Sequence, residues 1–431
     1  MLARDLRRIV PDGHVLEDAG CRSYAIQGMV PPLVVRPASI EDVSAVLRIA
    51  HAAHVAVAPW GGGARQYLGF PPRRLDLVVS LERLRRSLIY RPDDLTISLE
   101  AGMRFDELAR LLAPARQMLP LDPALPATST IGGIVATNSN GPRRLLYGSC
   151  RDVLIGMTVV QADGTVSHSG GMVVKNVSGY DMHKLHLGAL GTLGIVVTTN
   201  FKLLPLPAME QTVLFENCAL AQASDLSRRL ILSPLGIASI TVQCKGHHGD
   251  DRLRLAIRCE GRSPVVARQV RDVQALATRS GLPSPSILEG DEHTALWDDI
   301  VASGHGALGD AREAVISVSV LPSRVEETLS ELARLASIGG LSLLWVAHMA
   351  TGLVTLRVHP STDAWPESLR TFQQACLSRW PRTLVVNCPP EIKAGIAVWG
   401  APPSGISIMR RIKHEFDPHD ILNPGRFLVS S

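Results

Sequence analysis

Apolar residues in the first half of the chain form short runs that favour buried strands, and segments with helical spacing separate these runs. Ser39 can cap a helix that starts at residue 40, because a serine hydroxyl accepts a hydrogen bond from the first helical turn. A second helix is expected over residues 105–112, and Asp163 with Gly164 indicates a hairpin between two of the strands. The predicted strands cover residues 32–36, 55–59, 75–79, 95–101, 153–161, 166–168 and 193–204.

From about residue 208 onward, strand-like runs alternate with helical ones. This alternation predicts an α+β domain with a mostly antiparallel sheet. Pro402 and Pro403 then separate that domain from a short tail, residues 406–427. The expected strands are 238–244, 253–259, 315–320, 341–348 and 353–358, and the expected helices are 224–230, 265–280, 325–336 and 368–380.

Composition excludes several classes of protein. The 431 residues carry 44 Lys and Arg against 40 Asp and Glu, and this net charge of +4 is too small for a nucleic-acid-binding surface. Apolar residues make up 46% and charged residues 19%, so the chain can bury a large core. The mean hydropathy of +0.15 is high, but the most apolar stretch, residues 341–358, includes His348 and Arg357 and indicates two buried strands with a turn. We expect no transmembrane segment, and the scattered charges of residues 1–20 predict no signal peptide.

The cysteines give no sign of a metal or disulfide framework. There are seven, widely spaced and without any C-x-x-C pair. This argues against zinc ribbons, cysteine-bound iron–sulfur clusters and structural disulfides. A reducing cytoplasm is therefore the expected setting.

A glycine-rich turn after the strand 55–59 is the first candidate site. Three consecutive glycines allow positive φ and close approach of the backbone to a ligand. Consecutive N–H groups in such a turn form a concavity for an anion, and a diphosphate is the natural guest. An ordinary tight turn is an equally open interpretation of these residues alone. The segment consists of Trp60, Gly61, Gly62, Gly63, Ala64 and Arg65.

A second candidate combines small and polar residues over 121–141. Gly132 and Gly133 can open a helix whose first N–H groups face a ligand. Taken alone, a helix loosened by glycine and packed closely on a sheet is the favoured interpretation. The candidate residues here are Asp122, Thr130, Gly132, Gly133, Ala136, Thr137, Asn138 and Gly141.

A third segment, residues 175–195, is rich in small residues. His183 and His186 stand three apart, as metal ligands on a helix can, but no acidic or cysteine partner lies at ligand spacing, so we predict no metal there. Asn176 begins a formal glycosylation sequon that a cytosolic chain leaves unmodified. Residues 304–309 fit G-x-G-x-x-G, but they follow a helical stretch and precede a strand. The dinucleotide fingerprint needs the reverse order, so we expect a loop there.

Motifs along the chain occur in an order that resembles one family. They are Arg36-Pro37, the glycines 61–63, the strand 75–79 and the segments 100–102, 119–123, 131–138, 147–148, 179–181, 191–195, 416–418 and 421–426. Together they resemble the FAD-binding domain of the vanillyl-alcohol-oxidase/p-cresol-methylhydroxylase (PCMH) superfamily, over about residues 30–207 and 406–427. Within it, residues 139–144 and 174–181 are most similar to the FAD-binding E subunits of bacterial glycolate oxidases, which work beside a second flavoprotein and an iron–sulfur subunit.

The resemblance implies a fold and a cofactor site. Residues 1–207 would form a PCMH-type FAD domain of two subdomains, residues 208–405 an α+β cap with an antiparallel sheet, and residues 406–431 a segment that returns to the FAD domain. Residues 61–65 would hold the diphosphate, residues 131–138 would follow the flavin and ribityl chain, Gly194 and Ile195 would meet the adenine, and Asn423 the isoalloxazine. The residues implied to bind FAD are Trp60, Gly61, Gly62, Gly63, Ala64, Arg65, Asp122, Thr130, Gly132, Gly133, Ala136, Thr137, Asn138, Gly141, Tyr147, Gly148, Gly194, Ile195 and Asn423.

Two departures from the family pattern qualify the expected chemistry. Ala64 and Arg65 stand where some members attach FAD through a histidine, so non-covalent FAD is expected. Residues 347–352 resemble a remnant of a segment that binds a metal in many D-2-hydroxy-acid dehydrogenases, but the second histidine and the downstream E-H-G are absent. His348 is the one candidate catalytic residue, and a buried strand histidine with a satisfied hydrogen bond is an equally open interpretation.

The resemblance implies an FAD-dependent oxidoreductase that transfers a hydride from the α-carbon of a small 2-hydroxy acid to flavin N5. Electrons would leave through an iron–sulfur partner, beside a second flavoprotein subunit, in the cytoplasm or at the inner membrane through those partners. Arg65, Arg144 and Lys175 are candidates for binding the substrate carboxylate, because they neighbour the flavin motifs. A non-catalytic assembly subunit with the same fold is the alternative, and a self-sufficient oxidase for sugars or alcohols is less favoured.

Overall fold

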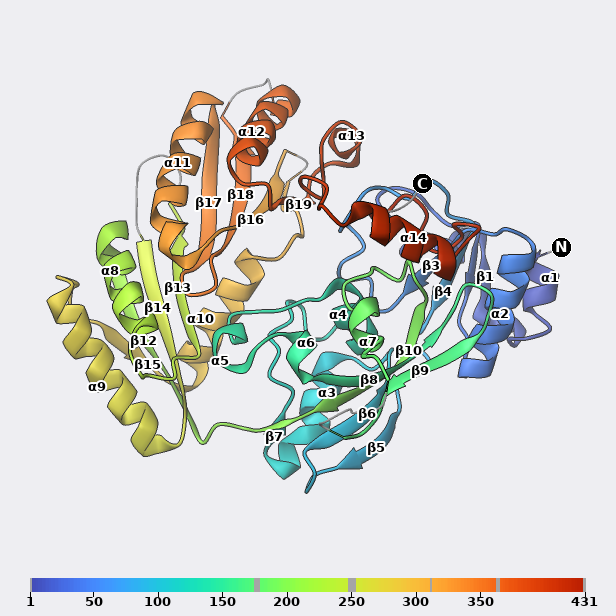
Figure 1. Ribbon diagram of the computed structural model, residues 1–431, viewed down its shortest axis with the longest axis horizontal. Helices are drawn as coiled ribbons and strands as arrows, with labels where there is room; N and C mark the ends of the chain where they lie inside the picture. Colours follow the sequence, from blue (N-terminus) through green and yellow to red (C-terminus); the bar gives the residue numbers. More distant parts are fainter. Residues whose placement is uncertain (1, 174–178, 247–252, 311, 362–364, 429–431) are drawn as a thin grey trace. The chain divides into compact units, whose positions relative to one another are not determined.

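The computed structural model describes residues 2–173, 179–246, 253–310, 312–361 and 365–428, and the chain in it forms two compact units (Figure 1). The first unit contains residues 1–140, 149–206 and 402–431, and the second contains residues 141–148 and 207–401. The expected tail thus belongs to the first unit. The sequence did not predict that the short segment 141–148 groups with the second unit.

The first unit holds a four-stranded sheet near the N-terminus. β2 (Leu33–Val35), β4 (Leu77–Ser80) and β3 (Val57–Trp60) are parallel, and β1 (Val15–Glu17) is antiparallel at the edge. α2 (Ile40–Ala52) begins as predicted, with a capping box in which Asp42 N–H donates to the Ser39 hydroxyl at 3.1 Å. The short α1 (Leu2–Leu6) precedes this sheet.

A second, antiparallel sheet in the same unit has the order β5-β6-β10-β8-β9. The predicted hairpin at Asp163-Gly164 joins β8 to β9. Val46 of α2, Leu99 of β6 and Val159 of β8 belong to one core cluster, so the two sheets share a core and form the two subdomains that were expected. The strands are β5 (Ser87–Arg91), β6 (Thr96–Glu100), β10 (Ile195–Lys202), β8 (Leu154–Val160) and β9 (Val166–Gly170), with β7 (Gln117–Met118) paired to β11 (Leu204–Pro205).

Short helices connect the strands of this second sheet. They are α3 (Phe105–Leu112), which has the bounds predicted from the sequence, α4 (Ile131–Thr137), α6 (Cys150–Val153) and α7 (His183–His186). The C-terminal helix α14 (Ile406–Phe416) belongs to the same unit.

The second unit is built on an eight-stranded sheet in which all neighbouring strands are antiparallel, as predicted. Its order is β15 (Ser286–Leu288), β12 (Met209–Cys218), β14 (Leu253–Gly261), β13 (Ser239–Cys244), β17 (Leu341–His348), β18 (Leu353–Pro360), β16 (Ala314–Ser319) and β19 (Thr383–Asn387). The apolar stretch 341–358 is the hairpin of β17 and β18, and no helix in the described part of the chain is long and apolar enough to cross a membrane.

Helices cover this sheet (Figure 1). α9 packs against β12 and β14, and α11 packs against β17. α10 packs through Trp297 and Ile300 on Leu214, Ala256 and Val346. Residues 304–309 form a loop between α10 and β16, as expected from their order. The helices are α5 (Arg144–Tyr147), α8 (Leu220–Ile231), α9 (Ser263–Arg279), α10 (Gly290–Ser303), α11 (Val325–Ile338), α12 (Trp365–Arg379) and α13 (Pro390–Lys393).

Candidate functional site

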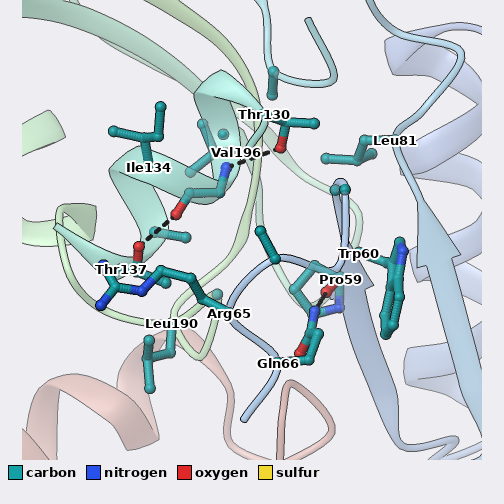
Figure 2. Close-up of a pocket in the computed structure, with 18 of the residues that line it drawn as sticks. Pro59, Trp60, Arg65, Gln66, Leu81, Thr130, Ile134, Thr137, Leu190 and Val196 are labelled. Atoms are coloured by element: carbon teal, nitrogen blue, oxygen red, sulfur yellow. Dashed lines mark hydrogen bonds between the residues drawn. The ribbon is translucent and has the colours of Figure 1, made fainter. Parts of the chain in front are cut away.

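A cavity in the first unit collects segments that are far apart in the sequence (Figure 2). It holds about 860 Å³ of empty space, including the part open to solvent. Figure 2 shows Arg65 extending toward Thr137 and Leu190, while Trp60 lies on the other side. The lining comprises residues 59–66, Leu81, Ala101, Ser129, Thr130, residues 132–134, Ala136, Thr137, Ser139, Leu190, Gly191, Ile195, Val196, Asn423 and Arg426.

The glycine loop packs directly on the chain that precedes α4. A Cβ on Gly61 would lie 2.1 Å from the Thr130 hydroxyl oxygen, and one on Gly62 would lie 1.6 Å from the Thr128 carbonyl oxygen. Gly63 has φ of +74°, a region that side chains disfavour. The consecutive glycines are therefore required by the close contact of two backbone segments, and that contact forms one wall of the cavity.

α4 brings small residues to a second wall. The Thr130 hydroxyl accepts a hydrogen bond from Gly133 N–H at 3.3 Å and caps the helix, as a threonine at this position does. A Cβ on Gly132 would lie 2.8 Å from the Ala101 Cβ, so the helix packs closely on the end of β6. The helix α4 thus packs closely on a sheet and also lines the cavity. The sequence analysis had treated close packing and a surface that faces a ligand as two alternative interpretations.

The cavity lining is cationic. Its charged members are Arg65 and Arg426, and it includes no acidic residue. Arg65 donates to the Ser139 hydroxyl at 2.7 Å, and its buried Nε has no hydrogen-bond partner in the described part of the chain. Burial lowers the pKa of Arg426 to about 10, so this guanidinium is still charged at neutral pH. It donates to the carbonyls of Gln66 at 2.9 Å and Leu68 at 2.8 Å.

The C-terminal tail completes the lining by returning beside β3. Val57 N–H donates to the Ile421 carbonyl at 2.7 Å, and Asn423 N–H donates to the Val57 carbonyl at 2.8 Å. The side-chain Nδ2 of Asn423 donates to the Leu190 carbonyl at 2.6 Å. Its Oδ1 is buried and has no partner among the described residues. A buried acceptor without a partner costs about 1–3 kcal/mol, so it points to a donor that a ligand would provide.

The cavity residues fit FAD. A diphosphate is anionic, and the lining supplies two guanidiniums and no carboxylate. The flavin ring and ribityl chain carry N–H and O–H donors, and Asn423 Oδ1 is an acceptor that lacks one. Much of the remaining lining is apolar or small, with a few polar groups among it, as is typical of cofactor sites.

Most of the predicted FAD residues line this cavity. They are Trp60, Gly61, Gly62, Gly63, Ala64, Arg65, Thr130, Gly132, Gly133, Ala136, Thr137, Ile195 and Asn423. Asp122, Asn138, Gly141, Tyr147, Gly148 and Gly194 are not part of the lining, and their contact with FAD stays a prediction. Tyr147, together with the rest of residues 141–148, belongs to the second unit, where its hydroxyl donates to Glu260. Gly194 lies against Val159, because a Cβ there would be 2.4 Å from the Val159 Cγ1.

Some lining residues were missed by sequence reasoning. Gly191 has φ of +68°, and a Cβ on it would lie 2.5 Å from the Pro59 ring. Gly191 and Arg426 both stand in motifs used for the resemblance, so a signal for them existed. Ser139 also stands in such a motif, the segment 139–144, whereas Gln66 and Leu81 had no distinguishing pattern. Ala101 and Ile134 line the cavity too, and they stand in the segments 100–102 and 131–138 used for the resemblance. The other lining residues that were not listed as FAD-binding are Pro59, Ser129, Leu190 and Val196.

The histidines considered for chemistry lie outside the cavity lining. His348 ends β17 in the second unit, with its Nδ1 2.9 Å from the Thr241 hydroxyl oxygen. His183 Nδ1 lies 3.2 Å from the Ser169 hydroxyl oxygen, and the buried His186 packs edge-on against Phe416. Among the described residues, no three His, Cys, Asp or Glu side chains gather as a metal site needs. A catalytic role for His348 stays a prediction.

The three candidates for binding the substrate carboxylate lie in different parts of the chain. Arg65 lines the cavity, whereas Arg144 begins α5 in the second unit. Lys175 and the sequon 176–178 lie outside the described residues.

Comparison with known proteins shows an FAD binding domain in this chain. Residues 31–170 match the model of an FAD binding domain, and residues 399–427 match the C-terminal domain of FAD linked oxidases. The chain is an FAD-binding protein of the PCMH fold. The structure of p-cresol methylhydroxylase with bound substrate superimposes with a TM-score of 0.77 at 17% identity, covering 99% of this chain and 96% of that one. An alkyldihydroxyacetonephosphate synthase structure gives a TM-score of 0.76 at 17% identity, covering 98% of this chain and 84% of that one.

Relatives extend over nearly the whole FAD-binding chain. Glycolate oxidase subunit GlcD of Bacillus subtilis (strain 168) is 26% identical, covering 93% of this chain and 89% of the relative. D-2-hydroxyglutarate dehydrogenase of Xanthomonas citri pv. viticola is 26% identical, covering 92% and 89%. D-lactate dehydrogenase of Archaeoglobus fulgidus is 26% identical, covering 91% and 90%. The predicted family, fold class and FAD cofactor are confirmed, while the finer resemblance to the E subunit and the non-covalent attachment stay predictions.

Proposed function

We propose that this FAD-binding chain oxidises a small 2-hydroxy acid and works as a subunit of a glycolate-oxidase-like complex. The observation that carries the proposal is the cationic cavity with the orphaned Asn423 Oδ1, in a chain whose full-length relatives are named for glycolate, D-lactate and D-2-hydroxyglutarate. These three compounds share a hydroxyl on the carbon next to a carboxylate. Bound FAD would supply the hydride acceptor, flavin N5, for that carbon.

The chain's own residues would bind and orient the cofactor. The backbone of Gly61–Gly63 and the Arg65 guanidinium would hold the diphosphate, because the loop has no side chains in the way and Arg65 has an unpartnered N–H. The small residues of α4 would form the wall along the ribityl chain. Asn423 Oδ1 would accept a hydrogen bond from a flavin or ribityl donor, which fixes the ring relative to the tail.

One relative that is itself named as a subunit supports the proposal of partner subunits. Since GlcD matches this chain over most of both lengths, we propose a comparable place in a multi-subunit complex. A second flavoprotein and an iron–sulfur subunit would take the electrons onward.

The experiment begins with the purified chain. It should be yellow, with absorbance in the flavin bands, and should release FAD on acid precipitation. Turnover of glycolate, D-lactate and D-2-hydroxyglutarate is then followed with an artificial electron acceptor, for the isolated chain and for the complex that copurifies from the native host. A colourless protein that takes up no added FAD contradicts the proposal, and bound FAD without turnover in either preparation favours a non-catalytic assembly subunit.

A further inference from the structure

A second cavity of the first unit adjoins the cavity that fits FAD, because the glycine loop lines both. The residues in both linings are Trp60, Gly61, Gly62 and Thr130. The rest of the second lining comes from the segments 23–24, 82–85 and 102–104, and no residue of these segments lines the FAD cavity. The second cavity holds about 1240 Å³ of empty space, including the part open to solvent. We call it the arginine cavity.

The arginine cavity has a surplus of positive charge. The charged side chains among its described lining residues are Arg83, Arg85, Arg104 and Glu82. The carboxylate of Glu82 is already engaged, because Arg36 pairs with its Oε1 at 3.1 Å and the Tyr24 hydroxyl donates to its Oε2 at 3.2 Å. Glu82 therefore does not neutralise the three lining arginines, and the cavity favours an anion.

The three lining arginines have weak partners or none. Arg83 donates to the backbone carbonyl of Arg36 at 3.0 Å, which orients the guanidinium without neutralising it. Arg85 pairs with Glu107 at 3.8 Å, and its side chain is 64% exposed. Exposed ion pairs of this kind contribute little free energy. The Arg104 side chain forms no ion pair with any residue that the structure describes.

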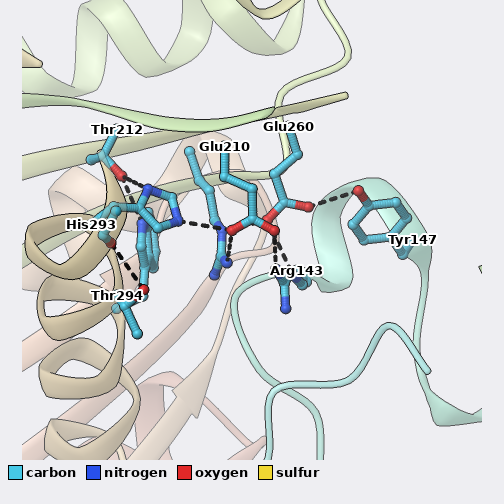
Figure 3. A network of polar contacts seen from close by, with 10 residues as sticks. Arg143, Tyr147, Glu210, Thr212, Glu260, His293 and Thr294 are labelled. Carbon is cyan, nitrogen blue, oxygen red and sulfur yellow. Dashed lines mark hydrogen bonds and ion pairs between the residues drawn. The ribbon is translucent and has the colours of Figure 1, made fainter. Parts of the chain in front are cut away.

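A polar network in the second unit shows how this chain pairs an arginine with buried carboxylates (Figure 3). There, Arg143 donates to Glu210 Oε1 at 2.8 Å and to Glu260 Oε1 at 2.9 Å, and the Glu260 side chain has no solvent exposure. A buried charge needs such a partner. The carboxylate that lines the arginine cavity, that of Glu82, is exposed instead. The lining arginines thus differ from those of a closed structural network.

An aromatic pair forms another part of the wall. Trp60 and Tyr24 both line the arginine cavity, and their rings meet edge to face with centroids 5.2 Å apart. The glycine loop packs on the indole, because a Cβ on Gly63 would lie 2.6 Å from the Trp60 ring. Guanidiniums bind phosphate oxygens in a bidentate way, and aromatic rings offer a surface on which a nucleobase stacks. The two features together suit a nucleotide.

We propose that the arginine cavity binds a second ligand, which carries a diphosphate and an aromatic base as a nucleoside diphosphate does. Arg83, Arg85 and Arg104 would bind its phosphates, and Trp60 with Tyr24 would contact its base. This ligand is additional to FAD, since the lining arginines of the two cavities are different residues. The inference goes beyond the proposed oxidation of a 2-hydroxy acid and does not depend on it.

The test titrates FAD-saturated protein with ADP in a calorimeter, and with adenosine as the probe that lacks phosphates. We expect one ADP per chain, bound at least about 10-fold more tightly than adenosine and more weakly as salt is added. Arg85→Gln and Arg104→Gln should each weaken ADP binding about 10-fold, because each removes a charge-assisted hydrogen bond. Arg110→Gln is the matched control and should bind ADP like the wild type. Arg110 lies on α3 outside both linings and pairs with Asp106 at 2.9 Å.

Flavin absorbance of the same samples shows whether ADP and FAD occupy different sites. The protein should retain its FAD at saturating ADP, and release of FAD would overturn the inference, because ADP would then occupy the FAD cavity. Absence of ADP binding, equal binding of adenosine, or wild-type ADP affinity in both arginine variants would overturn it as well.

Folding and the proposed function are tested separately. Arg85 and Arg104 are exposed, so both variants should melt like the wild type, and if one does not fold the other decides. A wild type that binds no FAD contradicts the proposed function only. ADP titrations of that protein and of the two variants still decide the inference, because neither arginine lines the FAD cavity.

Discussion

The side-chain amide of Asn423 is bonded to the carbonyl of Leu190 at 2.6 Å, across 233 positions of the sequence. This bond uses the amide nitrogen and leaves Oδ1 as the buried acceptor in the cavity. Asn423 has φ of 47°, a left-handed conformation that asparagine tolerates better than most residues. Hydrogen bonds thus hold both the backbone and the side chain of Asn423 in place in the cavity lining.

Replacing Asn423 should therefore impair FAD binding more than folding. Asn423→Leu keeps a similar volume but removes the acceptor and the bond to Leu190, and we expect FAD affinity to fall about 10- to 100-fold, about 1.4–2.7 kcal/mol. The measurement is fluorescence titration of apoprotein with FAD. Glu415→Leu, on the exposed face of α14, provides the control and should bind normally. Unchanged affinity in Asn423→Leu would show that Oδ1 does not face the cofactor.

Gly62 tests whether the loop packing itself makes the cavity. Gly62→Ala would place a Cβ 1.6 Å from the Thr128 carbonyl oxygen, so one backbone segment must move. Overpacking of this kind costs about 1–3 kcal/mol of stability, and we expect FAD affinity to fall at least about 10-fold with it. Gly171→Ala is the matched control, because a Cβ there meets no atom of the described residues within 4 Å. Denaturation curves and FAD titrations of both variants give the result, and equal behaviour of the two would contradict the packing argument.

Local sequence patterns predicted the elements better than the cavity. The helix 105–112, the capping box at Ser39 and the hairpin at Asp163 each depend on residues close in sequence, and all three are found. The strand β5 was missed although it contains the apolar run 88–90, and most of its residues are exposed. The strand β12 was missed although it is long. Patterns of this kind record local propensity and burial, not which strands pair.

Long-range contacts explain what the sequence left open at the site. Leu81 lines the cavity only because distant segments meet there, and no local motif marks it. The glycines 61–63 were recognised from the sequence because a close approach of two backbone segments requires residues without a side chain, and a run of glycines is visible in the sequence. The sequence did not predict that residues 141–148 group with the second unit. Their contacts there are long-range, because Arg143 bonds to Glu210 and Tyr147 bonds to Glu260, each more than 60 positions away.

Protonation of His186 should destabilise the first unit in mildly acidic solution. Burial lowers the pKa of His186 from 6.5 to about 4. Between pH 4 and pH 6.5, His186 is therefore protonated in the unfolded chain and neutral in the folded chain. The resulting stability is complete above about pH 6.5 and is lost as the pH falls toward 4, by up to about 3 kcal/mol. His186→Leu, which can still pack on Phe416, should flatten this part of the stability profile measured by denaturation at a series of pH values. His414→Leu, at an exposed position of α14, should leave it unchanged, and an equally steep loss in His186→Leu would exclude His186 as the source.

Lys413 should link the stability of the tail to retention of FAD. Its ammonium is buried and pairs with Asp417, and it also donates to the Thr192 carbonyl at 3.0 Å. Asp417 in turn accepts from the N–H groups of Ile421 at 3.0 Å and Leu422 at 2.8 Å, directly before Asn423.

Lys413→Met keeps the apolar stem but leaves a buried carboxylate without its cation, which costs about 3–5 kcal/mol. Because the carboxylate holds the segment that carries Asn423, FAD should also dissociate faster, and the dissociation rate can be followed by the rise of flavin fluorescence after dilution. The double variant Lys413→Met with Asp417→Asn removes the orphaned charge while retaining a side-chain oxygen as acceptor, so it should regain part of both the stability and the slow dissociation. If dissociation is fast in Lys413→Met but stays equally fast in the double variant despite regained stability, the tail is held in place by contacts other than Asp417.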